Sequence, residues 1–211
     1  RKVLEFVDAH LSEELSVERL SDVAAFSKHH FHRQFSELFG IGVWRYVQLT
    51  RLKRASWQLA YRPALSVVDV ALASGYEGPE AFARAFRRNV GQSPSQFRKA
   101  PQWETWHTAC EPLSVLRTEH MKPPISAEQV RIVHFPETRV AELVHRGDPR
   151  RLGVSIRRFI EWRREHKLPP RISDTFNIVY DNEAETEPGD FRFGLCAATD
   201  RDIEPGSAGI A

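Results

Sequence analysis

Two short segments of the chain carry side chains that can hydrogen-bond the edges of nucleic-acid bases. The first contains His29, His32 and Arg33, and the second contains Glu80 and Arg84. Arginine can pair with guanine through two parallel hydrogen bonds, histidine can donate to guanine, and glutamate can accept from cytosine. These residue types therefore allow sequence recognition of DNA, provided that each segment lies on the exposed side of an element that enters a groove.

Both segments belong to an internal repeat. The tripeptide L-S-V at 15–17 recurs at 65–67, and F-x-R-x-F at 31–35 recurs at 82–86 after one extra residue. Gly40 and Gly91 end the two copies, and Ser16 and Ser27 are the N-cap candidates of the two helices of the first copy. Each copy, about 15–40 and 65–91, predicts a helix-turn-helix unit whose second helix enters the major groove of DNA. A periodic run from Val43 to Tyr61 predicts a long helix between them.

The apolar residues of each second helix predict its buried side, namely Phe31, Phe35 and Leu38 in the first copy and Phe82 and Phe86 in the second. The positions early in these helices that face outward are predicted to contact DNA. Predicted base contacts are His29, His32, Arg33, Pro79, Glu80 and Arg84. Predicted phosphate contacts are Lys28, Arg87 and Arg88. Pro79 has no side-chain hydrogen-bonding group.

A surface arginine on a helix is more often simply solvated, so the arginines alone would be weak evidence for DNA contact. The equivalence of Arg33 and Arg84 after equivalent turns favours the DNA interpretation. The three histidines 29, 30 and 32 could also suggest a metal site. No cysteine or carboxylate nearby completes a ligand set, so we expect neither a metal nor a cofactor.

Composition supports a globular protein with a polyanion partner for its first half. Hydrophobic residues make up 41% and charged residues 27% of the 211 residues, and no run approaches the roughly 18 apolar residues of a membrane span. Residues 1–100 contain 15 basic and 10 acidic residues, whereas residues 101–211 contain 15 and 18. Cys110 and Cys196 are too few for a disulfide scaffold, which indicates the reducing cytoplasm. The missing initiator Met suggests that residues precede Arg1.

The second half changes in character. Residues 101–128 contain Pro101, Pro112, Pro123 and Pro124, and the segment is predicted to be a linker whose Trp103, Trp106 and Leu113 could pack on a neighbour. Beyond it, apolar runs predict a strand, a helix and then two strands separated by a polar hairpin loop at 181–190. The residues of these runs are Val130, Ile132, Val140, Leu143 and Val144; Leu152, Ile156, Phe159 and Ile160; Phe176, Ile178 and Tyr180; and Phe191, Phe193 and Leu195. We therefore expect a multidomain chain, with an all-α domain (1–100) followed by an α+β domain of β-α-β-β order (129–211).

Residues 3–100 resemble the DNA-binding domain of the AraC/XylS family of bacterial transcription regulators. The resemblance rests on S-K-H-H-F-H-R-Q-F (27–35), W-R-Y-V-Q-L-T-R-L-K-R-A (44–55) and G-Y-E-G-P-E-A-F-A-R-A-F-R-R-N-V-G-Q-S-P-S-Q-F-R-K (75–99). It implies that both recognition helices enter adjacent major grooves on one face of the DNA. The positions predicted above to contact bases match those of the family. The implied partners are double-stranded DNA and RNA polymerase.

Residues 130–204 resemble the first half of a GyrI-like effector-binding domain. That family has two β-α-β-β units around a ligand cleft, and this chain ends where a second unit would begin, so the domain is expected to be incomplete. Aromatic walls with a few polar tips suit flat, amphipathic ligands. The candidate effector-binding residues are His145, Trp162, Tyr180 and Phe193. Core packing is the default alternative for Tyr180 and Phe193, which lie at predicted strand positions.

Three functions compete. A ligand-responsive transcription regulator uses both halves and is favoured. A hydrolase would need an activated nucleophile or a paired acid and base, and neither G-x-S-x-G nor H-E-x-x-H occurs, so the chain is not expected to be an enzyme. An architectural DNA binder would need only the first half.

Overall fold

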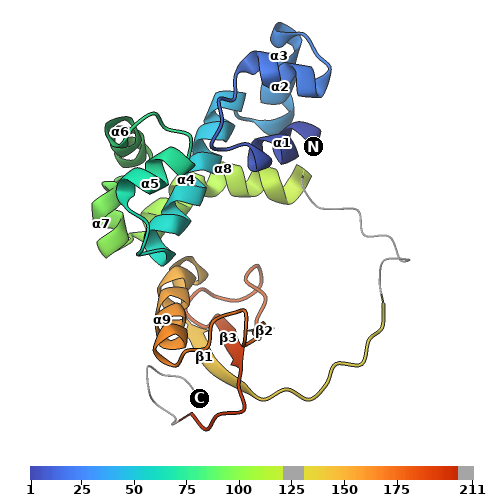
Figure 1. Cartoon of the computed structure of the whole chain (residues 1–211). Coiled ribbons are helices and arrows are strands. Elements are labelled where there is room, and N and C mark those ends of the chain that lie inside the picture. The colour runs from blue at the N-terminus through green and yellow to red at the C-terminus, as the bar shows by residue number, and fades with distance from the viewer. Residues whose placement is uncertain (121–130, 204–211) are drawn as a thin grey trace. The chain divides into compact units, whose positions relative to one another are not determined.

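The computed structural model describes residues 1–120 and 131–203, and the chain forms two compact units, Arg1–Ile125 and Ser126–Ala211 (Figure 1). The first unit is helical. Its helices are α1 (Lys2–Ala9), α2 (Val17–Ala24), α3 (Lys28–Phe39), α4 (Val43–Tyr61), α5 (Val67–Ala73), α6 (Pro79–Val90), α7 (Pro94–Lys99) and α8 (Trp103–His120). The second unit contains β1 (Val140–Arg146), the 3₁₀ turn η2 (Pro149–Arg151), α9 (Leu152–Glu165), β2 (Thr175–Val179) and β3 (Arg192–Ala198). None of the described helices is long and apolar enough to cross a membrane.

The internal repeat predicted from the sequence is confirmed as two helix pairs, α2–α3 and α5–α6, joined by α4. Ser16 caps α2 by accepting a hydrogen bond from the backbone N–H of Arg19. Ser66 caps α5 in a reciprocal capping box, in which the Asp69 side chain also accepts from the Ser66 N–H. The second helices end at Gly40 and Gly91, both in the left-handed conformation that glycine adopts without steric cost.

The core of the first repeat forms around aromatic side chains of α3 and α4. The rings of Phe31, Phe35 and Tyr46 pack edge to face at centroid distances of 5.7 and 5.8 Å. The prediction that Leu38 faces this core is wrong, because its side chain is 61% exposed. Phe39 takes the core position instead and packs on Phe35 and on the His120 ring of α8. Phe31, Phe35 and Phe39 follow one another every four residues and form the buried side of α3, so Leu38 lies beside that side in solvent.

The segment from Trp103 to His120 departs from the expected linker, because it forms helix α8 and packs within the first unit. The prolines at 101, 112, 123 and 124 predicted a linker, although the apolar residues of this segment have a helical period. Trp103, Trp106, Cys110, Leu113 and Leu116 recur every three or four residues. Pro112 lies inside α8, where it removes one backbone hydrogen bond and crowds the carbonyl of the preceding turn. The buried Leu113 and Leu116 pack into the core of the first repeat and compensate for that loss.

The second unit has the expected β-α-β-β order. Its antiparallel sheet has the strand order β1-β3-β2, with Leu143 opposite Leu195 and Asn177 also opposite Leu195. Helix α9 covers one face of the sheet, and its Phe159 and Trp162 form a core with Leu143 and Leu195. The polar loop between β2 and β3 closes the hairpin as predicted.

Two details of the predicted strands differ. Ile132 is fully exposed and lies outside any strand, because the described sheet offers no neighbour before Val140. Tyr180 directly follows β2 rather than lying in it. Val130, which was predicted to begin the first strand, lies outside the described residues.

Candidate nucleic-acid interface and small-molecule site

The turns of the two repeats position α3 and α6 by the same backbone route. Ala25 and Gly75 occupy equivalent positions with φ of 56° and 73°. In each turn the backbone N–H of the next residue donates a hydrogen bond back to the first helix. Phe26 donates to the Ser21 carbonyl (3.0 Å), and Tyr76 donates to the Ala71 carbonyl (3.1 Å). The two recognition helices therefore leave their first helices with matching turn geometry.

The outer side of α3 carries the predicted contact residues of the first repeat. Lys28, His29, His32 and Arg33 are all exposed, whereas Phe31 is buried. His29 lies three residues before His32 and four before Arg33, so each of these two side chains neighbours His29 on the helix surface. Two of the cations have carboxylate neighbours: Lys28 pairs with Glu18, and Arg33 lies 3.8 Å from Glu37. Exposed pairs of this kind are weak and can exchange for other anions.

The outer side of α6 carries the contact residues of the second repeat. Glu80, Arg84, Arg87 and Arg88 are exposed, and Pro79 at the first helical position is half-buried. Glu80, Arg84 and Arg87 follow one another at helical spacing and form one stripe. Because Pro79 is partly covered, Glu80 and Arg84 are better placed to reach a base edge.

The N-termini of the two recognition helices differ from those of the helices that precede them. Ser16 and Ser66 cap α2 and α5 with their side chains, but Gly78 gives α6 no side-chain cap. The prediction that Ser27 caps α3 is wrong, because its side chain makes no cap hydrogen bond. The first N–H groups of an uncapped helix have no partner within the helix, and they carry the positive end of the helix dipole. Such an end can bind a phosphate.

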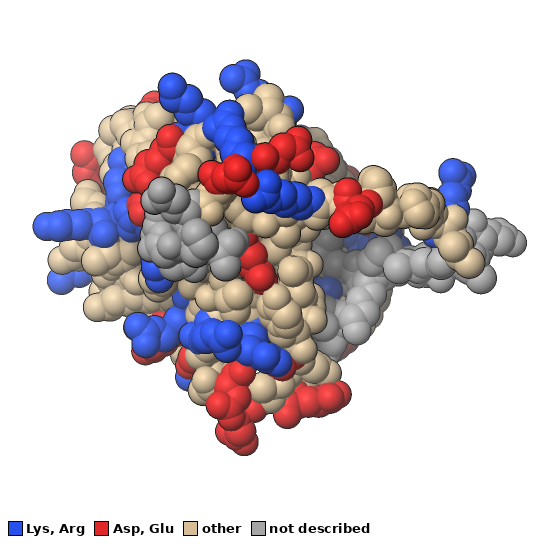
Figure 2. Space-filling model, turned by 90° about the horizontal axis from the view of Figure 1, so that it is seen from below, with Lys and Arg blue, Asp and Glu red and all other residues tan. Residues whose placement is uncertain are grey.

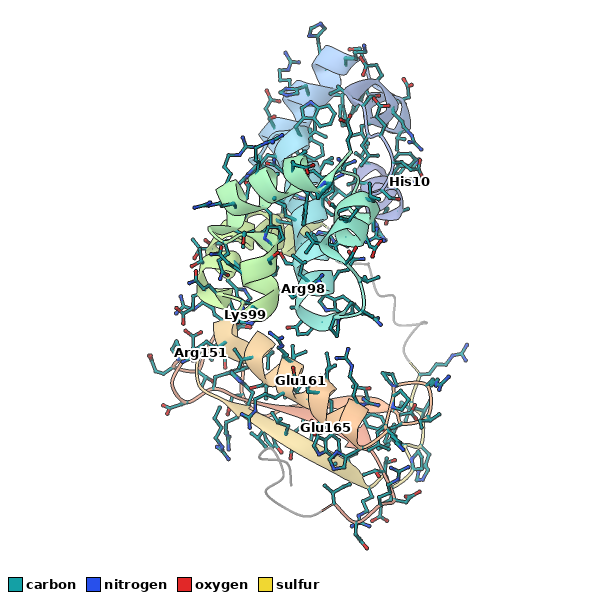
Figure 3. All side chains as sticks on the ribbon, turned by 60° about the vertical axis from the view of Figure 1, so that its left-hand side comes forward. His10, Arg98, Lys99, Arg151, Glu161 and Glu165 are labelled. Carbon is teal, nitrogen blue, oxygen red and sulfur yellow. The ribbon has the colours of Figure 1, made fainter. Side chains whose placement is uncertain are left out.

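Charge is arranged unevenly over the molecule. The face in Figure 2 mixes Lys and Arg with Asp and Glu side chains, so neither sign dominates it. Basic residues gather instead in the last turns of α6 and α7, at Arg87 and Arg88 and at Arg98 and Lys99, of which the last two are labelled in Figure 3. Over residues 1–120 and 131–203, no cluster of three or more His, Cys, Asp or Glu side chains could hold a metal ion.

The four candidate effector residues of the second unit do not lie together. His145, Trp162 and Phe193 face the core between α9 and the sheet, and His145 and Trp162 are only 5% and 1% exposed. His145 lies within hydrogen-bond distance of the Ser155 hydroxyl (2.9 Å) and the Asp148 carbonyl (3.2 Å). A carbonyl oxygen only accepts, so Nε2 of His145 donates to it, while Nδ1 pairs with the Ser155 hydroxyl.

Tyr180 lies on the opposite side of the sheet and remains 43% exposed. Its hydroxyl donates to the Glu142 carboxylate at 2.9 Å, and this hydrogen bond raises the pKa of Tyr180. The carboxylate lies over Gly194, where an added Cβ would collide with it and would come within 3.0 Å of Ile178. Glu142 was missed in the sequence, although its strand position, between the buried Ala141 and Leu143, places it on this face.

The outer side of α9 offers a different kind of surface. Glu161 and Glu165 lie on the side of α9 away from the sheet, and Arg151, the last residue of η2, lies at the start of the helix (Figure 3). Arg157 pairs with Glu161 at 3.3 Å. Charges of both signs on an exposed helix face are typical of a solvated surface. An amphipathic ligand is therefore better matched to the face that carries Tyr180.

Neither cysteine is suited to be a nucleophile. Cys110 and Cys196 are buried, and burial raises the pKa of each thiol to about 11. The reactive form of cysteine is the thiolate, so a neutral thiol without access to solvent is inert.

Comparisons with known proteins divide the chain at the same place. Residues 20–100 match the family described as a helix-turn-helix domain, and residues 128–210 match the GyrI-like small molecule binding domain. A protein of Bacillus subtilis (strain 168), named as an HTH-type transcriptional regulator, is 36% identical over 98 residues. A Staphylococcus aureus protein with the same kind of name is 31% identical over 97 residues. Each match covers 46% of this chain, but only 33% and 13% of the relatives.

Solved structures resemble the first half. The DNA-binding domain of AdpA, solved in complex with a target DNA, is 31% identical with a TM-score of 0.44 and covers 47% of this chain and 94% of that one. A probable AraC family transcriptional regulator from Rhodopseudomonas palustris is 24% identical with a TM-score of 0.44, covering 48% of this chain and 94% of that one. By the family matches, residues 20–100 are similar to known helix-turn-helix domains, and residues 128–210 are similar to GyrI-like small molecule binding domains.

Proposed function

We propose that the chain is a sequence-specific DNA-binding transcription regulator whose helices α3 and α6 enter adjacent major grooves on one face of the duplex. The observation that carries this proposal is the repeat itself. Arg33 and Arg84 lie exposed at equivalent positions of two helices that leave equivalent turns. The names of the Bacillus and Staphylococcus relatives, both HTH-type transcriptional regulators, support the same function.

Within this proposal the exposed early residues of each recognition helix read bases. These are His29, His32 and Arg33 in α3, and Pro79, Glu80 and Arg84 in α6. The phosphates are bound by Lys28, Arg87 and Arg88 and by the uncapped N-termini of both helices. Base contacts give the specificity, whereas phosphate contacts set the register and make the affinity depend on salt.

The test is selection from a library of random duplexes with the whole chain, followed by salt titration of the selected duplex. We expect a motif of two blocks about one helical turn apart and an affinity that falls roughly a hundredfold or more between about 50 mM and 200 mM salt. The double variant Arg33→Ala/Arg84→Ala should lose the motif. Arg171→Ala, an exposed arginine in the α9–β2 loop, should keep it. Failure of the wild-type chain to enrich any duplex would refute the proposal.

We further propose that the second unit binds a small, partly apolar effector, and that binding alters DNA affinity or contact with RNA polymerase. The description of the matching family as a small molecule binding domain supports this. Of the four candidates, Tyr180 is the most accessible, beside Glu142 and the exposed Ile178. This surface would suit an aromatic molecule that carries a hydrogen-bond donor for the carboxylate. A ligand at His145 or Trp162 would have to displace core side chains.

Calorimetry with a panel of aromatic cations and neutral aromatics tests the effector, with and without the selected duplex. Binding should weaken at least about tenfold in Glu142→Gln, which loses the charged acceptor. Arg151→Ala, at the start of α9, should bind as the wild type does. An effector must also bind the free and DNA-bound chain with different affinities, because only differential affinity shifts an equilibrium. If every ligand of the panel bound the free and the DNA-bound chain with equal affinity, regulation of DNA binding by these ligands would be refuted.

A further inference from the structure

Helix α8 connects the two helix-turn-helix repeats on the side that carries their cores. Its first turn packs on the second repeat, where the Trp103 ring stacks on Tyr61 of α4 at 5.8 Å and meets Phe97 of α7 edge-on at 5.4 Å. The start of α8 is also tied to the preceding loop, because the Gln102 N–H donates to the side chain of the buried Gln92. In Figure 1, α8 runs beneath α4 from this end toward α1.

The last turns of α8 pack on the first repeat. Leu113 and Leu116 are buried in its core, and the Arg117 guanidinium pairs with the Asp8 carboxylate of α1. Arg117 also donates to the Tyr46 hydroxyl of α4 at 3.3 Å, and its charge lies 5.9 Å from the Tyr46 ring centroid. A partly buried arginine with two polar partners and an aromatic ring fixes its helix more tightly than apolar packing alone.

Both recognition helices touch α8 at their C-terminal ends. A Cβ added at Gly91, which ends α6, would lie 3.4 Å from the methyl group of Thr105. The His120 ring packs edge-on against Phe39, the last residue of α3, at 4.8 Å. Thr105 and His120 are separated by about 22 Å along a straight helix. A single helix therefore contacts the far ends of the two helices whose near ends carry the predicted base contacts.

We propose that α8 is a strap that fixes the distance and angle between the two recognition helices, with Arg117 as the positioning residue that ties it to the first repeat. The strap touches no DNA but sets the spacing of the two half-sites that the chain accepts. This inference rests on the proposed DNA-binding function. Each base pair added between half-sites moves the second by about 3.4 Å and rotates it by roughly 34°. A rigid pair of helices must reject such a change, whereas a loosened pair tolerates it.

The test measures binding of the whole chain to the selected duplex and to versions with one or two base pairs added to or removed from the spacer. We expect the wild type to lose about tenfold or more in affinity for one added base pair. Arg117→Ala should reduce that loss to about threefold or less while leaving the affinity for each isolated half-site unchanged. Loss of stability alone cannot give this result, because folded molecules would keep the wild-type spacing preference.

Two further variants keep the test decisive. His120→Ala removes the contact with Phe39, and we expect the variant to remain folded, which circular dichroism will check. Its affinity should depend less on the length of the spacer than that of the wild type. Ser66→Ala removes the exposed cap of α5 and leaves the contacts of Arg117 and His120 in place, so affinity should still fall steeply when the spacer changes. The strap proposal would be refuted if affinity fell steeply with spacer changes in both Arg117→Ala and His120→Ala. It would also be refuted if the affinity of the wild type did not depend on the spacer. A wild type that selects no two-block site would instead refute the DNA-binding proposal.

Discussion

The two helix-turn-helix repeats have turns of the same backbone conformation, but the surroundings of the two turns differ. Ala25 adopts the left-handed conformation in an exposed turn, although that conformation costs an alanine about 1 kcal/mol. Gly75 adopts it where Arg51 of α4 passes directly over the turn and donates to the Leu11 carbonyl at 3.0 Å. The backbone conformation alone therefore does not demand glycine here. Glycine is needed at position 75 because Arg51 and the Leu11 carbonyl approach the turn so closely. The second turn therefore lies inside the unit, whereas the first lies at its edge.

The largest expected effect is that of Gly75→Ala. An added Cβ would lie 2.6 Å from the Arg51 side chain and closer still to the Leu11 carbonyl oxygen, so backbone must move. We expect the free energy of unfolding to fall by about 3 kcal/mol or more. The matched variant Ala25→Gly should change it by less than about 1 kcal/mol, because relief of strain and added chain entropy oppose each other. Urea denaturation of both variants measures this, and equal losses would contradict the comparison.

The second prediction assigns each repeat to one block of the DNA motif. Arg33→Ala and Arg84→Ala should each reduce affinity for the selected duplex by about 1–3 kcal/mol and relax base preference in one block only. The two blocks should be about 34 Å apart along the duplex. Repeating the selection with each variant measures this. A variant that keeps the wild-type motif with equal information content in both blocks would exclude that arginine from base recognition.

A smaller effect should follow from the last turns of the recognition helices. The position of Arg88 in α6 is occupied by Glu37 in α3, so the second repeat offers a cation to phosphate where the first offers an anion. Arg88→Ala should lower affinity about fivefold at 0.15 M salt for all duplexes alike and reduce the slope of log affinity against log salt by about 0.9. Glu37→Gln should raise affinity slightly. An effect of Arg88→Ala on base preference would contradict its role.

The smallest difference should be between the two helix caps. Ser66→Ala removes one side of a reciprocal capping box and should cost about 1 kcal/mol, whereas Ser16→Ala removes a single cap hydrogen bond and should cost somewhat less. Thermal unfolding of both variants measures the order. A larger loss in Ser16→Ala would show that the surroundings of α2, rather than the cap, decide its stability.

Local signals predicted much of the first unit. The cap at Ser16, the helix ends at Gly40 and Gly91, and α4 from Val43 to Tyr61 each depend on residues within a few positions of one another. Such features are visible in a sequence because the chain itself supplies both partners. The β-α-β-β order of the second unit was predictable for the same reason, from alternation and periodicity.

The failures involve contacts between residues distant in the chain. Phe39, rather than Leu38, packs toward the core, and one of its contacts is His120 of α8, some eighty residues later in the chain. Helix α8 itself was hidden by Pro112, whose cost is offset by packing on both repeats. The effector candidates separated because strand pairing sends Tyr180 and His145 to opposite faces of the sheet.

The most direct test of the central claim, that both recognition helices bind one site, is hydroxyl-radical footprinting of the whole chain on its selected duplex. The account predicts two protected windows on one face of the DNA, about 10 base pairs apart from centre to centre. Gly75→Ala, if it remains folded, should weaken one window more than the other. A single protected window, or uniform protection along the duplex, would contradict the claim that α3 and α6 read adjacent major grooves together.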